Sequence, residues 1–410
     1  MLKNIMNENV FYQYLRTESI FNEKKVLLSS FIPEKILHRE KEIQQISCVL
    51  APILKGFKPN NLFIYGTCGT GKTICTRFVL NQLNEVGKNK HIKTMYINCK
   101  MKKVADTEYR LFTQFLRELG VCMPDTGLPT DVIIRQFFDV VEKEKQNLII
   151  ALDEIDALLK KIGDDFLYNL TRANTELKNS TISIIGITND LSFRENLDPR
   201  IKSSLSEEEI LFRPYNALEL RDILYERIKN GFKEGVIDDF VLNKCAAMAA
   251  QEHGDARRAL DLLRVAGEIA ERNGDTRITE KHIDMAQEKI DLDRVVETIK
   301  NQPKQSQAVL YAIIILNDKI KEKKNGKWVD SRMLTGDIFE MYKNICNANG
   351  LNILTQRRVS DLINELDMLG IITANVVSKG RYGRTREISL ALNENVLEKT
   401  RKLLFERFGM

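Results

Sequence analysis

The stretch Gly66-Thr67-Cys68-Gly69-Thr70-Gly71-Lys72-Thr73 matches G-x-x-x-x-G-K-[ST], the loop that holds nucleotide phosphates, without a mismatch. Apolar residues at 61–65 predict a buried strand before the loop, and residues 72–86 space their apolar side chains as a helix does. This setting lets backbone N–H groups and a helix N-terminus face phosphate oxygens. We expect Lys72 to reach the outer phosphates and the Thr73 hydroxyl to bind Mg²⁺.

A second stretch, LIIALDEID at residues 148–156, is an apolar strand that ends in carboxylates. Asp153 is suited to the Mg²⁺ shell, and Glu154 is suited to orient and deprotonate the attacking water. Acids also open helices as caps, so this stretch alone does not decide between a cap and a Mg²⁺ site. Together the two motifs predict a site that binds a nucleoside triphosphate with Mg²⁺ and hydrolyses it.

Length and composition exclude several classes of protein. A chain of 410 residues suggests two or three domains. The longest uninterrupted apolar stretch, 308–316, is too short to span a bilayer, and no apolar segment follows a basic start. We therefore expect no membrane partner and no signal peptide. The seven cysteines form no C-x-x-C pair and the four histidines are scattered, which favours a reducing, cytoplasmic location over a zinc or disulfide framework.

The alternation of strand and helix patterns predicts a parallel, three-layer α/β sheet. The expected strands are 61–65, 93–98, 147–152, 181–187 and 208–212, and the expected helices are 36–54, 72–86, 107–119, 131–145 and 164–178. From about residue 215 to 290 the pattern is wholly helical, and Pro303 with its polar flank marks another boundary. The predicted organisation is an N-terminal arm (1–35), an α/β core (36–214), a helical segment (215–299) and a C-terminal domain (300–410).

Three further polar residues are candidates for the nucleotide site. Asn189 follows the strand 181–187, where it either polarises the attacking water or caps the following turn. Arg257 starts a helix in the helical segment and either reaches phosphate or remains solvated. Arg200, in the segment LDPR, is a candidate arginine finger for the nucleotide of a neighbouring subunit.

The C-terminal domain has the features of a duplex DNA-binding domain. It holds 19 Lys and Arg against 12 Asp and Glu, whereas the preceding residues hold 43 against 45. A predicted helix at 355–366 buries one apolar face and leaves Gln356, Arg357 and Ser360 on a polar face suited to the major groove. Two strands around residues 378–384 then form a hairpin, the wing. Its candidate contacts with DNA are Lys379, Arg381, Tyr382, Arg384 and Arg386.

The ordered set GTCGTGKT, LIIALDEID, TND, DPR and GDARRAL resembles that of AAA+ ATPases. More narrowly, it resembles the archaeal origin-recognition replication initiators, relatives of the origin recognition complex subunits and of the eukaryotic helicase loader. ILHRE at 36–40, GLPTD at 127–131 and the winged-helix pattern extend the resemblance over nearly the whole chain from about residue 20. It implies a RecA-like α/β P-loop ATPase core, an all-α lid and a C-terminal winged-helix domain.

The resemblance also implies roles for individual residues. Walker A would be Lys72 and Thr73, Walker B Asp153 and Glu154, sensor 1 Asn189 and sensor 2 Arg257. Leu37, His38 and Arg39 would lie near the adenine. Many initiator relatives carry a second arginine where this chain has Ser204, which leaves Arg200 as the remaining candidate for a finger acting in trans.

The implied function is a slow ATPase that binds ATP or ADP with Mg²⁺ and hydrolyses ATP to ADP and phosphate. It would bind origin duplex DNA as a nucleoid-associated replication initiator. Its implied partners are the replicative minichromosome maintenance helicase, which it would help recruit or load, and a paralogous initiator. Two alternatives stay open. A clamp-loader or branch-migration type AAA+ ATPase would not need the winged helix. A non-hydrolysing, ATP-bound DNA-binding regulator would not need Glu154.

Overall fold

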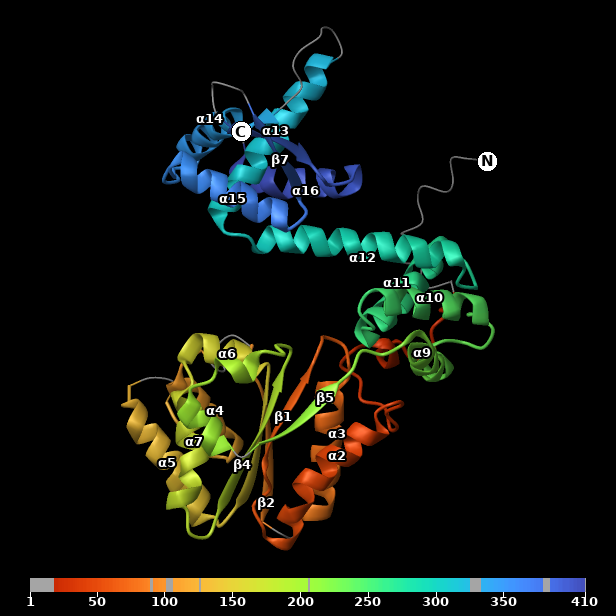
Figure 1. Ribbon diagram of the computed structural model, residues 1–410. Coiled ribbons are helices and arrows are strands. Elements are labelled where there is room, and N and C mark those ends of the chain that lie inside the picture. Colours follow the sequence, from red (N-terminus) through yellow and green to blue (C-terminus); the bar gives the residue numbers. More distant parts are fainter. Residues whose placement is uncertain are drawn as a thin grey trace. The chain divides into compact units, whose positions relative to one another are not determined.

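A computed structural model describes residues 18–88, 91–100, 106–124, 127–205, 207–324, 333–378 and 384–409 (Figure 1). Contacts divide the chain into two compact units, Met1–Ile283 and Asp284–Met410. The predicted core and helical segment thus share one unit. The division falls inside the long helix α12 (Glu280–Asn301), whose C-terminal end lies near the expected boundary at residue 299.

Five parallel strands form the sheet of the first unit, in the order β2-β3-β4-β1-β5. Their bounds are β1 (Asn61–Gly66), β2 (Ile92–Asn98), β3 (Asn147–Asp153), β4 (Thr181–Thr188) and β5 (Glu207–Phe212). All five were expected from the sequence, within one residue at each end. Asp153 pairs with Ile187, and Tyr65 pairs with Thr188. The C-terminal ends of β3, β4 and β1 therefore meet at one edge of the sheet.

Helices cover both faces of this sheet, as the continuous burial of β1, β3 and β4 requires. Leu62 and Ile64 of β1 pack in one core with α2 (Glu40–Leu50) and α3 (Lys72–Gly87). Phe63 and Tyr65 point into the other core. Figure 1 shows its helices on the opposite side of the sheet from α2 and α3. They are α4 (Glu108–Glu118), α5 (Thr130–Lys143), α6 (Ile155–Ile162), α7 (Asp165–Glu176) and α8 (Pro199–Leu205). This confirms the three-layer prediction.

One predicted helix differs in its bounds, and two short helices of the sheet region, α6 and α8, were not predicted. The single helix expected at 36–54 begins only at Glu40, because His38 adopts a left-handed conformation (φ 59°). It ends at Leu50 and passes into a 3₁₀ turn, η2 (Ala51–Lys55), in which Pro52 lacks the N–H that a continuing helix needs. The short helix α6 was not foreseen, because its residues directly follow the carboxylates that end β3.

The lid is a helical bundle that joins the core within the same unit. Its helices are α9 (Ala217–Gly231), α10 (Asp239–Gln251), α11 (Ala256–Asn273) and the start of α12. The described part of the predicted N-terminal arm packs on this bundle. Phe21 pairs with Phe232 as an antiparallel bridge, and their rings lie 4.8 Å apart. Buried Arg227 donates to the carbonyl oxygens of Val26 (3.1 Å) and Phe31 (3.4 Å). We call residues 18–36 the strap.

The second unit combines helices with a small antiparallel sheet in the order β6-β8-β7. Its helices are α13 (Lys304–Lys324), α14 (Thr335–Ala348), α15 (Gln356–Met368) and α16 (Glu394–Phe408), and its strands are β6 (Met333–Leu334), β7 (Ile372–Ser378) and β8 (Arg384–Leu390). The predicted helix at 355–366 and the predicted hairpin are confirmed as α15 and β7–β8. The two-residue strand β6 was not foreseen, because it is too short to show an alternating pattern.

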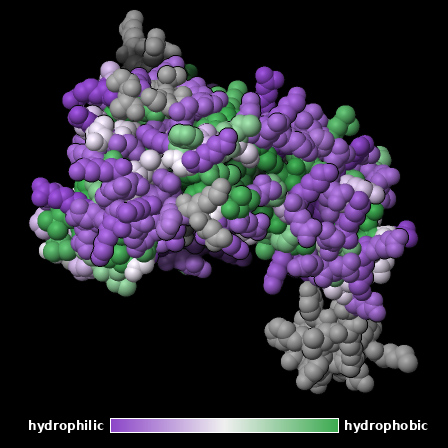
Figure 2. All heavy atoms as spheres, turned by 90° about the horizontal axis from the view of Figure 1, so that it is seen from below, coloured by the Kyte–Doolittle hydropathy of each residue, from purple (hydrophilic) through white to green (hydrophobic). Residues whose placement is uncertain are grey.

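Hydrophilic side chains cover most of the face shown in Figure 2, with hydrophobic residues in smaller groups among them. Within the described ranges, no helix is both long and apolar enough to cross a membrane.

Candidate functional site

The glycine-rich loop adopts a backbone that only glycine accepts readily. Gly69 and Gly71 have φ angles of 71° and 94°, in the left-handed region, and Gly71 caps the N-terminus of α3. Space excludes side chains as well. A Cβ atom on Gly69 would lie 1.7 Å from a carboxylate oxygen of Asp255, and one on Gly71 would lie 2.8 Å from the Tyr215 hydroxyl. The loop therefore packs closely against Asp255 of the lid and against Tyr215, which lies between the core and the lid.

Lys72 connects this loop to the candidate sensor on β4. Its ammonium donates to the carbonyl oxygens of Gly66 and Thr67, both at 2.7 Å, and to Oδ1 of Asn189 at 2.8 Å. The side chain is buried, and this desolvation lowers the pKa of Lys72 to about 8. Asn189 thus lies beside the loop, as the sequence predicted from its position after a strand.

Asp153 is held by donors on both carboxylate oxygens. Oδ2 accepts hydrogen bonds from the Thr73 hydroxyl (2.8 Å) and from the Tyr96 hydroxyl, and Oδ1 accepts the Glu154 N–H (3.0 Å). A carboxylate and a hydroxyl are oxygen ligands of the kind that Mg²⁺ prefers. The oxygen atoms of Thr73 and Asp153 are therefore a pair of ligands that fits this ion.

Tyr96 and Arg77 also belong to this cluster, and sequence reasoning missed both. Burial raises the pKa of Tyr96, and the Arg77 guanidinium lies 4.0 Å from the centre of its ring. Their sequence signal is weak, because Tyr96 reads as one apolar residue of a strand. Its contact with Asp153 follows from the pairing of β2 with β3, which the sequence does not give.

Glu154 occupies a sharp turn between β3 and α6. Its φ and ψ angles are 56° and 46°, a left-handed conformation that is costly for a residue with a side chain. Its Oε2 lies 3.3 Å from the ammonium of Lys100, just beyond the end of β2. The turn directs the candidate base toward the hollow in which the other candidate groups meet.

Arg257 approaches the loop from the lid. Asp255 caps α11 by accepting hydrogen bonds from the backbone N–H groups of Arg257 (2.8 Å) and Arg258 (3.3 Å). The N–H of Ala256 donates to the Gly69 carbonyl oxygen at 3.2 Å, and the Arg257 guanidinium lies 3.8 Å from Sγ of Cys68. The N-terminus of a lid helix therefore contacts the phosphate-binding loop directly.

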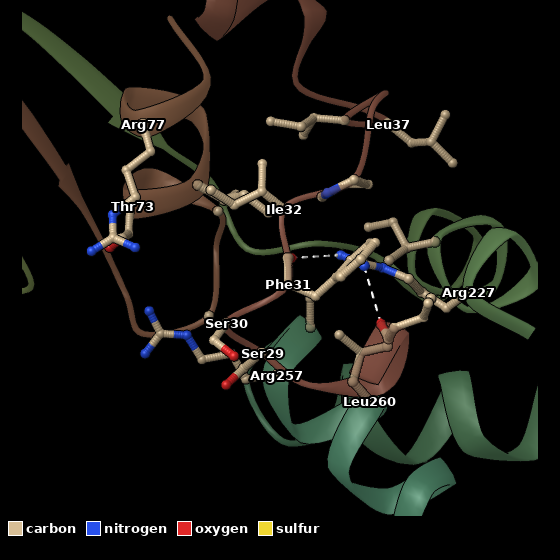
Figure 3. A pocket seen from close by; sticks show the side chains of 18 of the residues that line it. Ser29, Ser30, Phe31, Ile32, Leu37, Thr73, Arg77, Arg227, Arg257 and Leu260 are labelled. Atoms are coloured by element: carbon tan, nitrogen blue, oxygen red, sulfur yellow. Dashed lines mark hydrogen bonds between the residues drawn. The ribbon is translucent and has the colours of Figure 1, made fainter. Parts of the chain in front are cut away.

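A cavity of about 880 Å³ extends from this cluster. Figure 3 shows Thr73 and Arg77 on one side of it and Arg257 and Leu260 on the lid side, with the strap residues 29–32 between them. The volume is within the range usual for pockets that hold small molecules. A smaller hollow at its polar end is lined by Gly69, Thr70, Gly71, Lys72, Thr73, Asp153, Glu154, Asn189 and Arg257. The structure thus brings the predicted phosphate-site residues together.

The three residues expected near adenine differ in position. Leu37 lines the cavity, whereas His38 pairs with Asp222 of α9 (3.1 Å). The buried Arg39 guanidinium donates to the carbonyl oxygens of Thr70 (2.9 Å) and Arg213 (2.5 Å) and lies 3.9 Å from the Tyr215 ring centre. His38 and Arg39 therefore join the core to the lid and to the linker between them.

Arg200 lies on the surface rather than in the cluster. Its side chain is 83% exposed and pairs with Asp198 at 3.2 Å. The hydrogen bond from Arg200 keeps the pKa of Asp198 below its usual value. This position on an exposed turn of α8 is compatible with a contact to a neighbouring molecule.

The candidate DNA-binding residues that the structure describes lie on α15 and β8. Thr355 caps α15 by accepting the Arg358 N–H, which leaves Gln356 and Arg357 exposed in the first turn. The carbonyl oxygen of half-buried Ser360 accepts a hydrogen bond from Arg386 at 3.3 Å, so the helix is tied to a wing strand. Lys379, Arg381 and Tyr382 lie outside the described residues, as does the side chain of Arg384.

Three family models match successive parts of the chain. They describe an AAA domain (residues 55–195), a Cdc6 AAA+ ATPase-type lid domain (221–288) and a CDC6 C-terminal winged helix domain (297–400). These three ranges correspond to the sheet, the lid and the second unit.

Similar proteins span nearly the whole chain. An ORC1-type DNA replication protein of Thermococcus onnurineus is 50% identical over 389 residues, which cover 93% of this chain and 91% of the relative. An ORC1-type DNA replication protein 1 of Methanosarcina mazei is 48% identical over 412 residues, which cover 100% and 96%. The structure of the Aeropyrum pernix ORC1 protein in complex with DNA is 43% identical, with a TM-score of 0.79, and the match covers 95% of this chain and 98% of that one.

Proposed function

Because this chain belongs to the family of ORC1-type DNA replication proteins, we propose that it is an ATP-dependent replication initiator that binds origin duplex DNA. The observation that supports the nucleotide half is the convergence of Lys72, Asp153, Glu154, Asn189 and Arg257 around one hollow. Three separate strand ends and a lid helix contribute these residues. Such convergence is typical of a phosphoryl-transfer site, where positioning and charge do most of the work.

In the proposed reaction, each group acts on a defined part of ATP. Lys72 neutralises the outer phosphates, and Thr73 with Asp153 would hold Mg²⁺, which supplies further positive charge there. Glu154 takes the proton of the attacking water, and Asn189 orients that water. Arg257 contacts phosphate from the lid, so that ATP draws the lid onto the loop. The pairing of Glu154 with Lys100 competes with its contact to water, which supports a slow rate.

The DNA half of the proposal rests on the second unit. Gln356 and Arg357 are exposed in the first turn of α15, where side chains reach base edges in the major groove. Arg386 and the wing cations would contact backbone phosphates, and the basic excess of residues 300–410 favours a polyanion. The likeness to a relative solved in complex with DNA supports the same conclusion.

The proposed partners follow from the family and from the exposed finger candidate. The ATP-bound form would help recruit or load the replicative minichromosome maintenance helicase. A paralogous initiator is the second proposed partner, and Arg200, which is exposed, would contribute to its nucleotide.

A titration with a fluorescent ATP analogue in Mg²⁺ tests the nucleotide half. Lys72→Ala removes the cation of the loop, so the affinity should fall by at least about tenfold, since one lost interaction of 1.4 kcal/mol already gives that factor. Lys88→Ala, at the exposed end of the same helix, should bind as the wild type does. Unchanged affinity in a folded Lys72→Ala variant would refute the site. Footprinting on genomic fragments tests the DNA half, and an absence of any protected site would refute it.

A further inference from the structure

A partly buried hydrogen bond links the turn after β3, which holds Glu154, to the end of β4, directly before Asn189. The hydroxyl of Thr188, the last residue of β4, donates to Oδ1 of Asp156 at 2.9 Å. Asp156 lies in the first turn of α6, two residues beyond Glu154. The bond therefore joins the ends of two neighbouring strands, each followed by a group proposed to act on the attacking water.

The Thr188 hydroxyl has defined partners on both sides. Its proton goes to Asp156, because an ionised carboxylate only accepts, and its oxygen accepts the Asp190 N–H at 3.0 Å. The residues on either side of Asn189 are thus fixed by one hydroxyl group. Oδ1 of Asn189 faces Lys72 at 2.8 Å, which leaves its amide N–H groups for another acceptor.

The stability of the fold does not require a hydrogen bond between Thr188 and Asp156. Thr188 is fully buried at the end of an apolar strand, where valine would fill the same volume without a polar group to satisfy. An acid in the first turn of a helix is favourable in solvent and needs no contact with another strand. Glu154, two residues before Asp156, holds a left-handed conformation that requires support from its surroundings.

We propose that Asp156 and Thr188 are positioning residues that set the separation between Glu154 and Asn189. Without their hydrogen bond, the turn that holds Glu154 moves away from β4. Glu154 and Asn189 can then no longer contact the same water molecule. The phosphate contacts of the loop and of Lys72 are made elsewhere, so nucleotide binding persists. This inference rests on the proposed function, because it assigns a role within the same hydrolytic site.

Single-turnover hydrolysis of ATP and equilibrium binding of ATP, measured on the full chain, test this role. Thr188→Val keeps the shape and removes the hydroxyl, so hydrolysis should fall by about tenfold to a hundredfold, the range in which small misplacements act, while ATP affinity stays within about twofold. Thr188→Ser restores the hydroxyl and should recover most of the rate. Asp156→Ala removes the acceptor and should give a loss similar to that of Thr188→Val.

A double-mutant cycle separates positioning from general damage. Combining Asp156→Ala with Thr188→Val should cost no more than either change alone, and Thr188→Val should cost nothing further when Asn189 is already alanine. Three results would overturn the proposal. They are a double variant whose loss of rate is the product of the two single losses, a wild-type rate in Thr188→Val, and a loss of ATP affinity as large as the loss of rate. Thermal unfolding shows whether each variant folds. If Thr188→Val does not fold, the rate and ATP affinity of Asp156→Ala, a change at a half-buried position, test the proposal instead. If Glu154→Gln retains wild-type hydrolysis, the proposed function itself has failed, which is a distinct result.

Discussion

The proposed nucleotide site at the sheet edge and the proposed DNA-binding surface of α15 are built in opposite ways. At the sheet edge, functional side chains hold one another, as in the bonds of Lys72 to Asn189 and of Thr73 to Asp153. On α15, Gln356 and Arg357 are exposed in the first turn of their helix. The first arrangement fixes geometry before a ligand arrives, as catalysis requires. The second leaves side chains free to adapt to a base sequence, so there a substitution should affect binding but not the fold.

The largest effect should come from Glu154→Gln, at the left-handed turn that follows β3. The change removes the proposed base but keeps the shape and the Asp153 contacts, so ATP hydrolysis should fall by at least about a hundredfold. ATP affinity should remain close to that of the wild type. Glu176→Gln, on the exposed end of α7, is the control for a lost carboxylate. Release of phosphate at the wild-type rate would remove Glu154 from the mechanism.

The second effect tests the packing between Gly254 of the lid and Tyr215, in the linker between the core and the lid. An alanine Cβ at Gly254 would lie 2.3 Å from the Tyr215 carbonyl oxygen, whereas at Gly235 it would meet nothing within 4 Å. Both glycines have positive φ angles, so the backbone strain is similar and only Gly254→Ala adds overpacking. Denaturant unfolding should show Gly254→Ala less stable than Gly235→Ala by about 1–3 kcal/mol. Equal losses would mean that this junction is loose.

The third effect addresses sequence preference on α15. Replacing Gln356 and Arg357 with alanine removes groups placed to read base edges, which should cost about 1–3 kcal/mol on the preferred duplex. The loss on a random duplex should be much smaller. The midpoint of thermal unfolding should not change, because both side chains are exposed. A large change in stability would show that Gln356 and Arg357 make contacts that support the fold, as the side chains at the nucleotide site do.

The smallest effect concerns the wing, whose tip lies outside the described residues. Replacing Arg381 and Arg384 with alanine should weaken binding to every duplex alike. It should also reduce the slope of log affinity against log salt by about one to two units, one for each lost phosphate contact. Lys402→Ala, which removes an exposed cation from α16, is the control and should leave the slope unchanged. A loss confined to the preferred duplex would reverse the roles assigned to wing and helix.

The sequence predicted those features that depend on local patterns. The glycine loop matches a motif, the five strands are runs rich in apolar residues, and α15 combines helical spacing with a cap, so neighbouring residues are enough to locate them. The contacts of Tyr96, Asp156 and Arg39 were not predictable in the same way. They depend on which strands are neighbours in the sheet and on how the lid joins the core, and residues far apart in the chain decide both.

The placement of the strap has a consequence for the order of folding. Phe21 emerges early in synthesis, but its partner Phe232 follows about two hundred residues later, with the whole sheet between them. Closing such a long loop of unfolded chain is entropically unfavourable. A folded core shortens the path, because Arg39 and Arg213 then lie in contact and bring both chain segments to one place. The lid would thus be the last part of the first unit to close, and an interrupted chain would carry a finished sheet with an unpaired strap.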